Sequence, residues 1–142
     1  MKNTPLSIFA ASSWVITAAA QAADLYVSPD GNNTPPFANW AQAAMNIQAA
    51  VDAASEGDTI YLADHTYLLK ETITVDKAIT IKGFSGPDGC VIDGRNNVRC
   101  FDINDANLVD LTIQHGFVQG GFLGDPERRY GGGVYARNCV IS

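Results

Sequence analysis

The chain has 142 residues, of which 46% are hydrophobic and 17% are charged. This is ordinary globular composition, which excludes a disordered chain, a collagen and a coiled coil. The formal net charge is −6 and no basic block is present, so a nucleic-acid partner is not expected. Thirteen glycines and few lysine or glutamate residues favour a turn-rich β protein over a helical bundle.

Residues 1–22 have the features of an export signal. Lys2 supplies a positive charge, residues 6–20 are nearly all apolar, and Ala20 and Ala22 flank Gln21 as signal peptidase requires. The apolar run is short for a membrane anchor, which needs about 20 residues. We therefore predict cleavage after Ala22 and a mature chain, residues 23–142, that is secreted or displayed on the cell surface and has no membrane-spanning segment.

An amphipathic helix is predicted ahead of the main β region. A short strand over residues 24–28 and turn residues at 29–33 come first. Apolar residues then recur at helical spacing at Trp40, Ala44, Ile47, Val51 and Ala54. Asn39 is a good N-cap, Gln42 can bond back to it, and Gly57 ends the helix.

After Gly57 the pattern predicts short strands bounded by turn residues. They cover residues 59–62, 72–75, 78–81, 90–92, 101–103, 108–113, 133–135 and 139–141. The run at 79–81 matches the one at 101–103, and 90–92 matches 111–113, both at about 22 residues. A fixed long period favours an all-β fold, a parallel β-helix with three strands per coil. The amphipathic helix would cap the open end of that coil.

Alternation within these runs predicts which side chains form the interior of the coil. The inward positions are Ile79, Ile81, Phe101, Ile103, Leu111 and Ile113. The outward positions are Tyr61, Thr80, Asp102 and Thr112.

Three cysteines remain in the mature chain, Cys90, Cys100 and Cys139. They lack C-x-x-C spacing, which argues against a zinc site. Each lies at the edge of an apolar run, so we interpret them as small buried side chains. One disulfide in the oxidising exported state is the alternative, and the sequence does not indicate its pairing.

Several motifs resemble one known superfamily. Residues 47–54, the Gly57-Asp58 turn, the run at 59–62 and Thr66-Tyr67 closely resemble the opening of right-handed parallel β-helix proteins of the pectate-lyase-like superfamily. Residues 79–83, 91–94, 111–116 and 131–142 are similar to its later rungs. The chain departs from the pattern at His65, where glycine is usual, and at His115, where asparagine is common. The resemblance implies the fold more specifically than any activity.

The resemblance also implies a larger protein. Residues 28–40 are similar to large secreted bacterial β-helix proteins, and the chain ends inside a rung at residue 142. Since the terminal repeats of a solenoid normally need a polar cap, we expect residues 23–142 to be the N-terminal cap and first coils of a longer chain. The sequence indicates no oligomeric state.

Catalytic residues are not evident in this sequence. The resemblance implies lyases that hold calcium with clustered carboxylates, or hydrolases with paired aspartates. Asp102 is the one carboxylate clearly at an outward strand position, whereas Asp93, Asp105, Asp110 and His115 fall at corners, where a turn role is expected. We therefore expect no metal or cofactor in this part, with calcium an open question for the full-length protein.

The candidate binding residues are outward tyrosines and a charged insertion. Tyr61 and Tyr135 lie at strand positions from which they can stack on sugar rings, with Asp102 as a polar neighbour. The insertion at residues 117–130 contributes Arg128 and Arg129. Our first hypothesis is a secreted or cell-surface repeat module that binds glycans or other surfaces. The second is the N-terminal part of a polysaccharide lyase or glycoside hydrolase whose catalytic coils follow residue 142.

Overall fold

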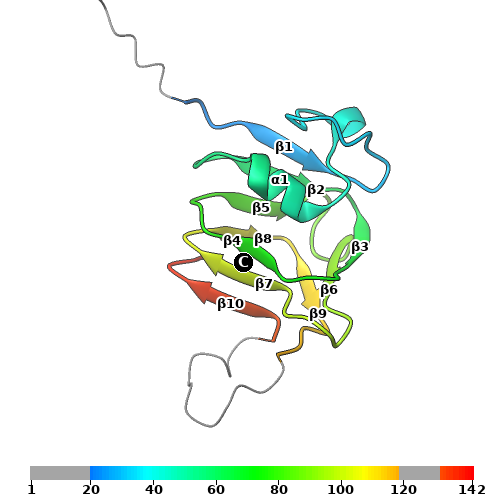
Figure 1. Cartoon of the computed structure of the whole chain (residues 1–142), viewed down its shortest axis with the longest axis vertical. Coiled ribbons are helices and arrows are strands. Elements are labelled where there is room, and N and C mark those ends of the chain that lie inside the picture. The colour runs from blue at the N-terminus through cyan, green and yellow to red at the C-terminus, as the bar shows by residue number, and fades with distance from the viewer. Residues whose placement is uncertain (1–19, 119–131) are drawn as a thin grey trace, which may run out of the picture.

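Parallel strands dominate residues 20–118 and 132–142, the part of the chain that this computed structural model describes. The strands form three sheets (Figure 1). Sheet A contains β1 (Asp24–Val27), β2 (Thr59–Leu62), β5 (Thr80–Gly83) and β8 (Asn107–Val109). Sheet B contains β3 (His65–Leu68), β6 (Cys90–Asp93) and β9 (Thr112–Gln114). Sheet C contains β4 (Ile73–Val75), β7 (Phe101–Asn104) and β10 (Val134–Arg137).

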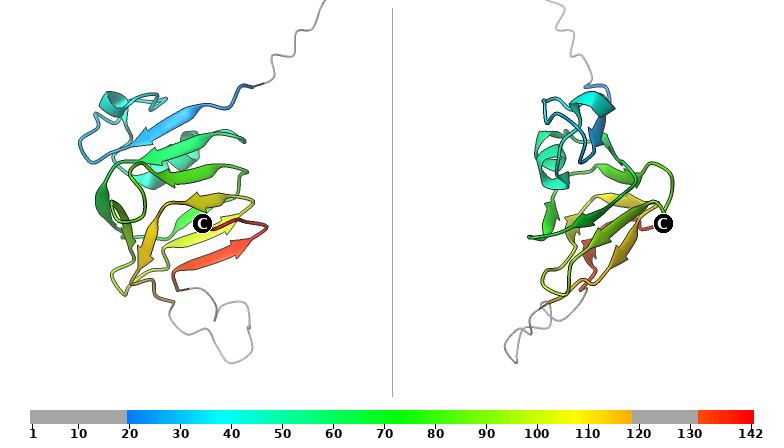
Figure 2. Two further views of the ribbon diagram at one scale, coloured as in Figure 1. Left: turned by 180° about the vertical axis from the view of Figure 1, so that it is seen from behind. Right: turned by 90° about the vertical axis from the view of Figure 1, so that its right-hand side faces the viewer.

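The chain visits sheets A, B and C in the same order three times, through β2–β3–β4, β5–β6–β7 and β8–β9–β10. Each strand pairs in parallel with its equivalent in the next turn. The two views of Figure 2 show these turns stacked along the long axis of the molecule. This arrangement is consistent with a parallel β-solenoid, and the expectation of a mostly β, parallel, coiled fold is confirmed.

The core is a column of aligned apolar side chains inside the coil. In sheet A, Ile60 is in register with Ile81, and Ile81 with Leu108. All three side chains are buried, as are Phe101 and Ile103 in sheet C. Parallel in-register pairing places equivalent residues about 4.8 Å apart, so identical positions in successive turns contact one another. The four inward predictions at Ile79, Ile81, Phe101 and Ile103 are confirmed, while Leu111 and Ile113 are only partly buried.

The predicted period is right for one sheet and wrong for another. Ile92 of β6 is in register with Ile113 of β9, as expected. The runs at 79–81 and 101–103, however, belong to sheets A and C, and Phe101 instead lies beside Ile73. The corners between strands differ in length, so the spacing between paired strands of successive turns varies from 21 to 33 residues.

Three strand predictions need correction. Residues 139–141, expected as a strand, form only an isolated bridge between Ile141 and Leu108. Residues 108–113, expected as one strand, are divided between β8 and β9 by a corner at Asp110, whose φ is 54°. Residues 65–68, which lie outside the predicted strands, form β3. Asp105 and His115 also have positive φ, at 63° and 49°, which confirms their role in corners.

The predicted helix is shorter than expected. The structure has a 3-10 helix, η1 (Trp40–Gln42), and a separate α-helix, α1 (Ile47–Ala53). Asn39 does cap η1, because its Oδ1 accepts a hydrogen bond from the Gln42 N–H at 3.0 Å. The helix does not continue because Ala44 instead pairs with the edge of β1: its N–H donates to the Tyr26 carbonyl, and its carbonyl accepts from the Ser28 N–H. Asn46 then caps α1 through the Ala49 N–H.

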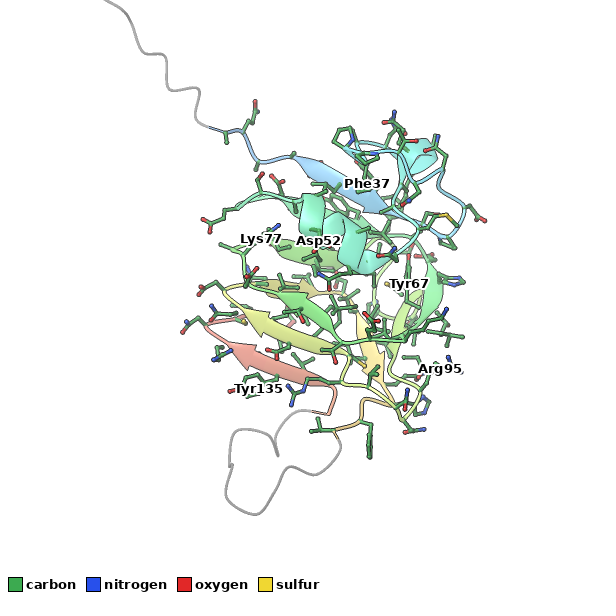
Figure 3. All side chains as sticks on the ribbon, in the orientation of Figure 1. Phe37, Asp52, Tyr67, Lys77, Arg95 and Tyr135 are labelled. Atoms are coloured by element: carbon green, nitrogen blue, oxygen red, sulfur yellow. The ribbon has the colours of Figure 1, made fainter. Side chains whose placement is uncertain are left out.

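Helix α1 packs across the first turns of the solenoid, next to β1, β2 and β4 (Figure 1). Ile47 and Val51 are buried, which confirms that the helix packs on the core. The Lys77 Nζ donates to the carbonyls of Val51 and Ala54, both at 2.8 Å, so a lysine from the corner after β4 holds the C-terminus of α1 (Figure 3).

The Gly57-Asp58 turn fastens the N-terminal strand to the solenoid. Gly57 has a φ of 89°, which favours glycine. Asp58 is buried, and its two carboxylate oxygens accept hydrogen bonds from the backbone N–H groups of Ala23 and Ser55, each at 2.8 Å. The Gly57-Asp58 motif, which resembles that of β-helix proteins, therefore serves here to hold the start of β1 against the end of the cap.

The three cysteines are free thiols in the structure. Cys90 and Cys100 are buried, and Cys139 is partly buried. Burial raises the pKa of the Cys90 thiol to about 12 and also raises that of Cys100. Both buried residues therefore act as small apolar side chains, as the first of the two interpretations expects.

Candidate functional site

Four aromatic side chains gather on the outer side of sheet A, at the capped end of the solenoid. Tyr26 of β1 and Tyr61 of β2 have ring centroids 5.8 Å apart, with a 25° angle between the ring planes. Trp40 of η1 meets Tyr26 edge-on at 4.7 Å and Phe84 edge-on at 5.0 Å. We refer to Tyr26, Trp40, Tyr61 and Phe84 as the aromatic platform.

Strand register and the cap together build this platform. Tyr26 and Tyr61 are register partners, and both alternate with buried neighbours, so their rings must leave the same face of the sheet. Trp40 reaches that face because the segment from Phe37 to Ala44 runs along the edge of β1 through backbone hydrogen bonds. Phe84 follows directly on the end of β5.

The platform leaves apolar surface in contact with water. Phe84 is 59% exposed, and the other three rings are partly exposed. A cluster of large apolar side chains on the outside of a sheet, rather than in its core, is typical of a surface that contacts a ligand or partner. Its rings lie edge-on or stacked, so they hold one another in position without a bound molecule.

Charged groups lie beside the platform but are paired with each other. Lys82 of β5 is in register with Tyr61, and its Nζ lies 3.6 Å from the Asp110 Oδ2. The two side chains are about equally exposed. Exposed ion pairs of this kind contribute little to stability.

A second group of outward side chains lies on sheet C. Asp102 of β7 is in register with Tyr135 of β10, near the other end of the described solenoid (Figure 3). The Arg99 Nη1 lies 3.6 Å from the Asp102 carboxylate, and the Arg99 guanidinium lies 5.1 Å from the centre of the Tyr135 ring. Arg137 approaches the same ring at 5.3 Å. The guanidinium groups thus flank the tyrosine ring in cation–π contacts.

The predicted binding residues therefore fall on two different sheets. Tyr61 belongs to the aromatic platform on sheet A, whereas Asp102 and Tyr135 are neighbours on sheet C. Arg128 and Arg129 lie outside the described residues. No single site combines all of these side chains within residues 20–118 and 132–142.

Sequence reasoning missed three of the four platform residues. Tyr26 has the same outward parity in its strand as Tyr61, so alternation alone could have identified it. Trp40 was expected on the buried stripe of a long helix, and this is wrong because the helix begins only at Ile47. Phe84 lies just past a strand end, where the sequence carries no periodic signal.

A hydrogen-bonded carboxylate organises the corner after β6. Asp93 is 9% exposed, and it accepts hydrogen bonds from the Arg95 N–H at 2.7 Å and the Gln114 side-chain amide at 3.0 Å. The Nδ1 of His115 also lies 3.0 Å from its Oδ2. The bonds from His115 and Arg95 hold the pKa of Asp93 below its ordinary value.

This corner should make the protein sensitive to acid. Because the pKa of Asp93 is lower in the folded state, its contribution is complete above the unfolded value of about 3.9 and is lost as the pH falls through the folded value. We expect the urea midpoint to fall less between pH 5 and pH 2 in Asp93→Asn than in the wild type. His115→Asn keeps a residue tolerant of positive φ, and its urea midpoint should fall by an intermediate amount between pH 5 and pH 2. An equal fall of the urea midpoint in all three proteins would contradict this role for Asp93.

No group of three His, Cys, Asp or Glu side chains suited to a metal ion occurs in the described ranges. Among the same residues, no helix is long and apolar enough to cross a membrane.

Comparisons of the chain with protein-family models, with curated proteins and with solved structures found no match.

Proposed function

We propose that the chain is a secreted or cell-surface module of the right-handed parallel β-helix class that binds glycan chains through the aromatic platform. The exposed position of Phe84 beside Trp40 is the observation that carries the proposal. Sugar rings present flat C–H faces that pack on aromatic rings, while their hydroxyl groups need polar partners at the rim. Lys82 and Asp110 supply such partners next to Tyr61.

Two further arguments support the right-handed β-helix class of the fold and the export of the protein. Connections between parallel strands of one sheet are right-handed in about 98% of cases, so repeated parallel pairing in three sheets favours a right-handed coil. The charged, apolar and small-residue segments of residues 1–22 favour export. A long ladder of aligned strands also suits a long linear ligand, since the outward positions repeat along the axis.

The proposal predicts that single ring deletions weaken glycan binding. Phe84→Ala and Tyr61→Ala should each lower affinity about 5- to 20-fold, because one aromatic contact contributes about 1 to 2 kcal/mol. Affinity is measured by calorimetry against soluble xylan, mannan, polygalacturonate and alginate. Phe117→Ala removes an exposed ring outside the platform and should leave affinity unchanged.

Two results would contradict the proposal. The first is that none of the four polysaccharides binds the wild-type protein. The second is that Tyr135→Ala abolishes binding while Phe84→Ala and Tyr61→Ala do not, which would move the glycan site to sheet C.

A further inference from the structure

The capped end of the solenoid covers the free edges of two sheets. At the edge of sheet A, backbone groups of Tyr26 and Ser28 bond with Phe37 and Ala44. At the edge of sheet C, the Gln48 side-chain amide acts as a substitute strand: its Oε1 accepts from the Thr74 N–H at 3.0 Å, and its Nε2 donates to the Thr74 carbonyl at 3.2 Å. Uncovered strand edges tend to pair with other chains, so such covers are expected.

The edge of sheet B has no equivalent cover. The Leu69 N–H donates to the Asp93 carbonyl, on the side of β3 that pairs with β6. Backbone groups alternate between the two edges of a strand, so those of Thr66 and Leu68 face the opposite edge. No described residue forms a hydrogen bond with them there, and both side chains are exposed.

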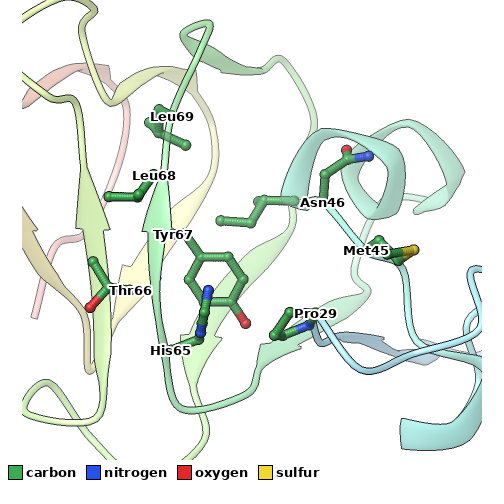
Figure 4. Close-up of a pocket in the computed structure, with 9 residues that line it drawn as sticks. Pro29, Met45, Asn46, His65, Thr66, Tyr67, Leu68 and Leu69 are labelled. Carbon is green, nitrogen blue, oxygen red and sulfur yellow. The ribbon is translucent and has the colours of Figure 1, made fainter.

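A groove lies along this edge. Pro29, Met45, Asn46 and Ile47 form one wall and residues 65–69 form the other, around a volume of about 530 Å³ (Figure 4). A second hollow of about 770 Å³ shares Met45, Asn46, Ile47, Leu68 and Leu69 and extends the groove along residues 70–74. Met45 and Leu68 both line the groove and are 56% and 61% exposed, so each wall carries an exposed apolar residue.

We propose that the groove binds an extended peptide segment of a partner protein, which adds to β3 as an extra strand of sheet B. Backbone N–H and C=O groups repeating at Thr66 and Leu68 match another peptide backbone, and they do not match a lipid or an isolated apolar molecule. Residues 45–47 form the facing wall, and the two hollows together run along residues 65–74, a length that an extended segment can follow.

The groove lining also indicates the side chains of the ligand. The described residues that line the 530 Å³ part include no aspartate, glutamate, lysine or arginine. Tyr67 is buried and bonds through its hydroxyl to the carbonyl of Ala63 at 2.9 Å, and burial raises its pKa. An uncharged segment with apolar side chains at alternate positions therefore fits, with one face on Met45 and Leu69 and the other in water.

The probe is the blocked peptide acetyl-Lys-Thr-Val-Thr-Leu-Thr-Val-Thr-Lys-amide, in which the uncharged segment is flanked by one lysine at each end for solubility. Two further versions carry N-methyl groups on the valine and leucine residues only, or on all residues from the second to the eighth. Binding to the mature chain is followed by fluorescence anisotropy of a labelled peptide and by hydrogen exchange of the Thr66 and Leu68 amides. We expect the unmodified peptide to bind and to slow exchange at both amides at least tenfold.

Variants on two faces separate this site from the aromatic platform. Met45→Lys puts a charge in the groove wall, and Phe84→Lys makes the same change at a similarly exposed apolar residue on sheet A. Met45→Lys should weaken peptide binding at least tenfold and leave glycan binding unchanged. Phe84→Lys should weaken glycan binding and leave peptide binding unchanged. Thermal melts monitored by circular dichroism establish that both variants are folded.

Three results would overturn the inference. One is that the unmodified peptide does not bind. Another is that the fully N-methylated peptide binds equally well, which would make the groove an apolar pocket without strand pairing. The third is that the protein forms a dimer that Met45→Lys dissociates and that the peptide does not disrupt, which would make a second copy the occupant. The version methylated only at valine and leucine blocks one of the peptide's two hydrogen-bonding edges. When the valine and leucine side chains face the groove, the edge that meets β3 depends on whether the peptide runs parallel or antiparallel to β3, so this version reports the strand direction.

Discussion

Gly83→Ala is expected to lower the free energy of unfolding by about 3 kcal/mol, at the upper end of what overpacking costs. Gly83 is the last residue of β5, and a Cβ added there would overlap the carbonyl oxygen of Asp110 and lie 3.0 Å from the Cβ of Cys90. The Asp110 carbonyl belongs to the corner between β8 and β9, and Cys90 begins β6. Backbone cannot rotate aside as a flexible side chain can, so two turns of the solenoid would have to separate.

Urea unfolding monitored by circular dichroism measures this effect. Gly133→Ala is the matched control, because among the described residues a Cβ there would meet only the Ile113 Cγ2, at an ordinary 3.5 Å. We expect the control to change stability by less than about 1 kcal/mol. Similar losses of stability in the two variants would show that the close approach of the backbone at Gly83 is not the reason why an added Cβ destabilises the protein.

Val51→Asp is expected to destabilise the cap by about 3 to 5 kcal/mol, the range for a buried charge without a partner. Val51 is 2% exposed and lies on the side of α1 that packs against the core. The Lys77 ammonium lies at the end of the helix, where it is already held by the carbonyls of Val51, Asp52 and Ala54, so it is not positioned to pair with a carboxylate directed into the core.

Ala53→Asp is the control for this substitution. Ala53 is exposed and lies in the same last turn of α1, so the added charge meets the same helix dipole but stays in water. The control should lose less than about 1 kcal/mol in the same urea titration. If Val51→Asp lost no more than Ala53→Asp, the helix would not be packed on the solenoid as described.

Local chemistry accounts for the parts of the fold that sequence reasoning predicted correctly. Alternation in short β-branched runs identified the inward Ile81 and Ile103 and the outward Tyr61, since a strand has only two faces. Residues that tolerate positive φ identified the corners at Asp105 and His115. Both signals act within a few residues and depend little on what packs around them.

The errors occurred where distant contacts compete with local preference. The spacing at Trp40, Ala44 and Ile47 suits one helix, but Ala44 instead bonds with the edge of β1, a pairing across 18 residues that local spacing does not reveal. The pairing of Phe101 with Ile73, rather than with the run at 79–81, depends on corner lengths that periodicity does not reveal. Of the binding candidates, Tyr61 joined a cluster that also contains Trp40 and Phe84, which are distant in sequence.

The sequence by itself determined the strand class, the faces of most predicted strands and many of the turns, because these follow from side-chain size, branching and permitted φ. Only the tertiary structure decided which strands stack on one another and which edges are covered. Gln48 on Thr74 and Ala44 on Tyr26 are contacts between segments far apart in the chain, and they form only once the coil brings those segments together. The aromatic platform and the open edge of β3 arise from the same step, because each combines residues from several turns or from the cap and a strand.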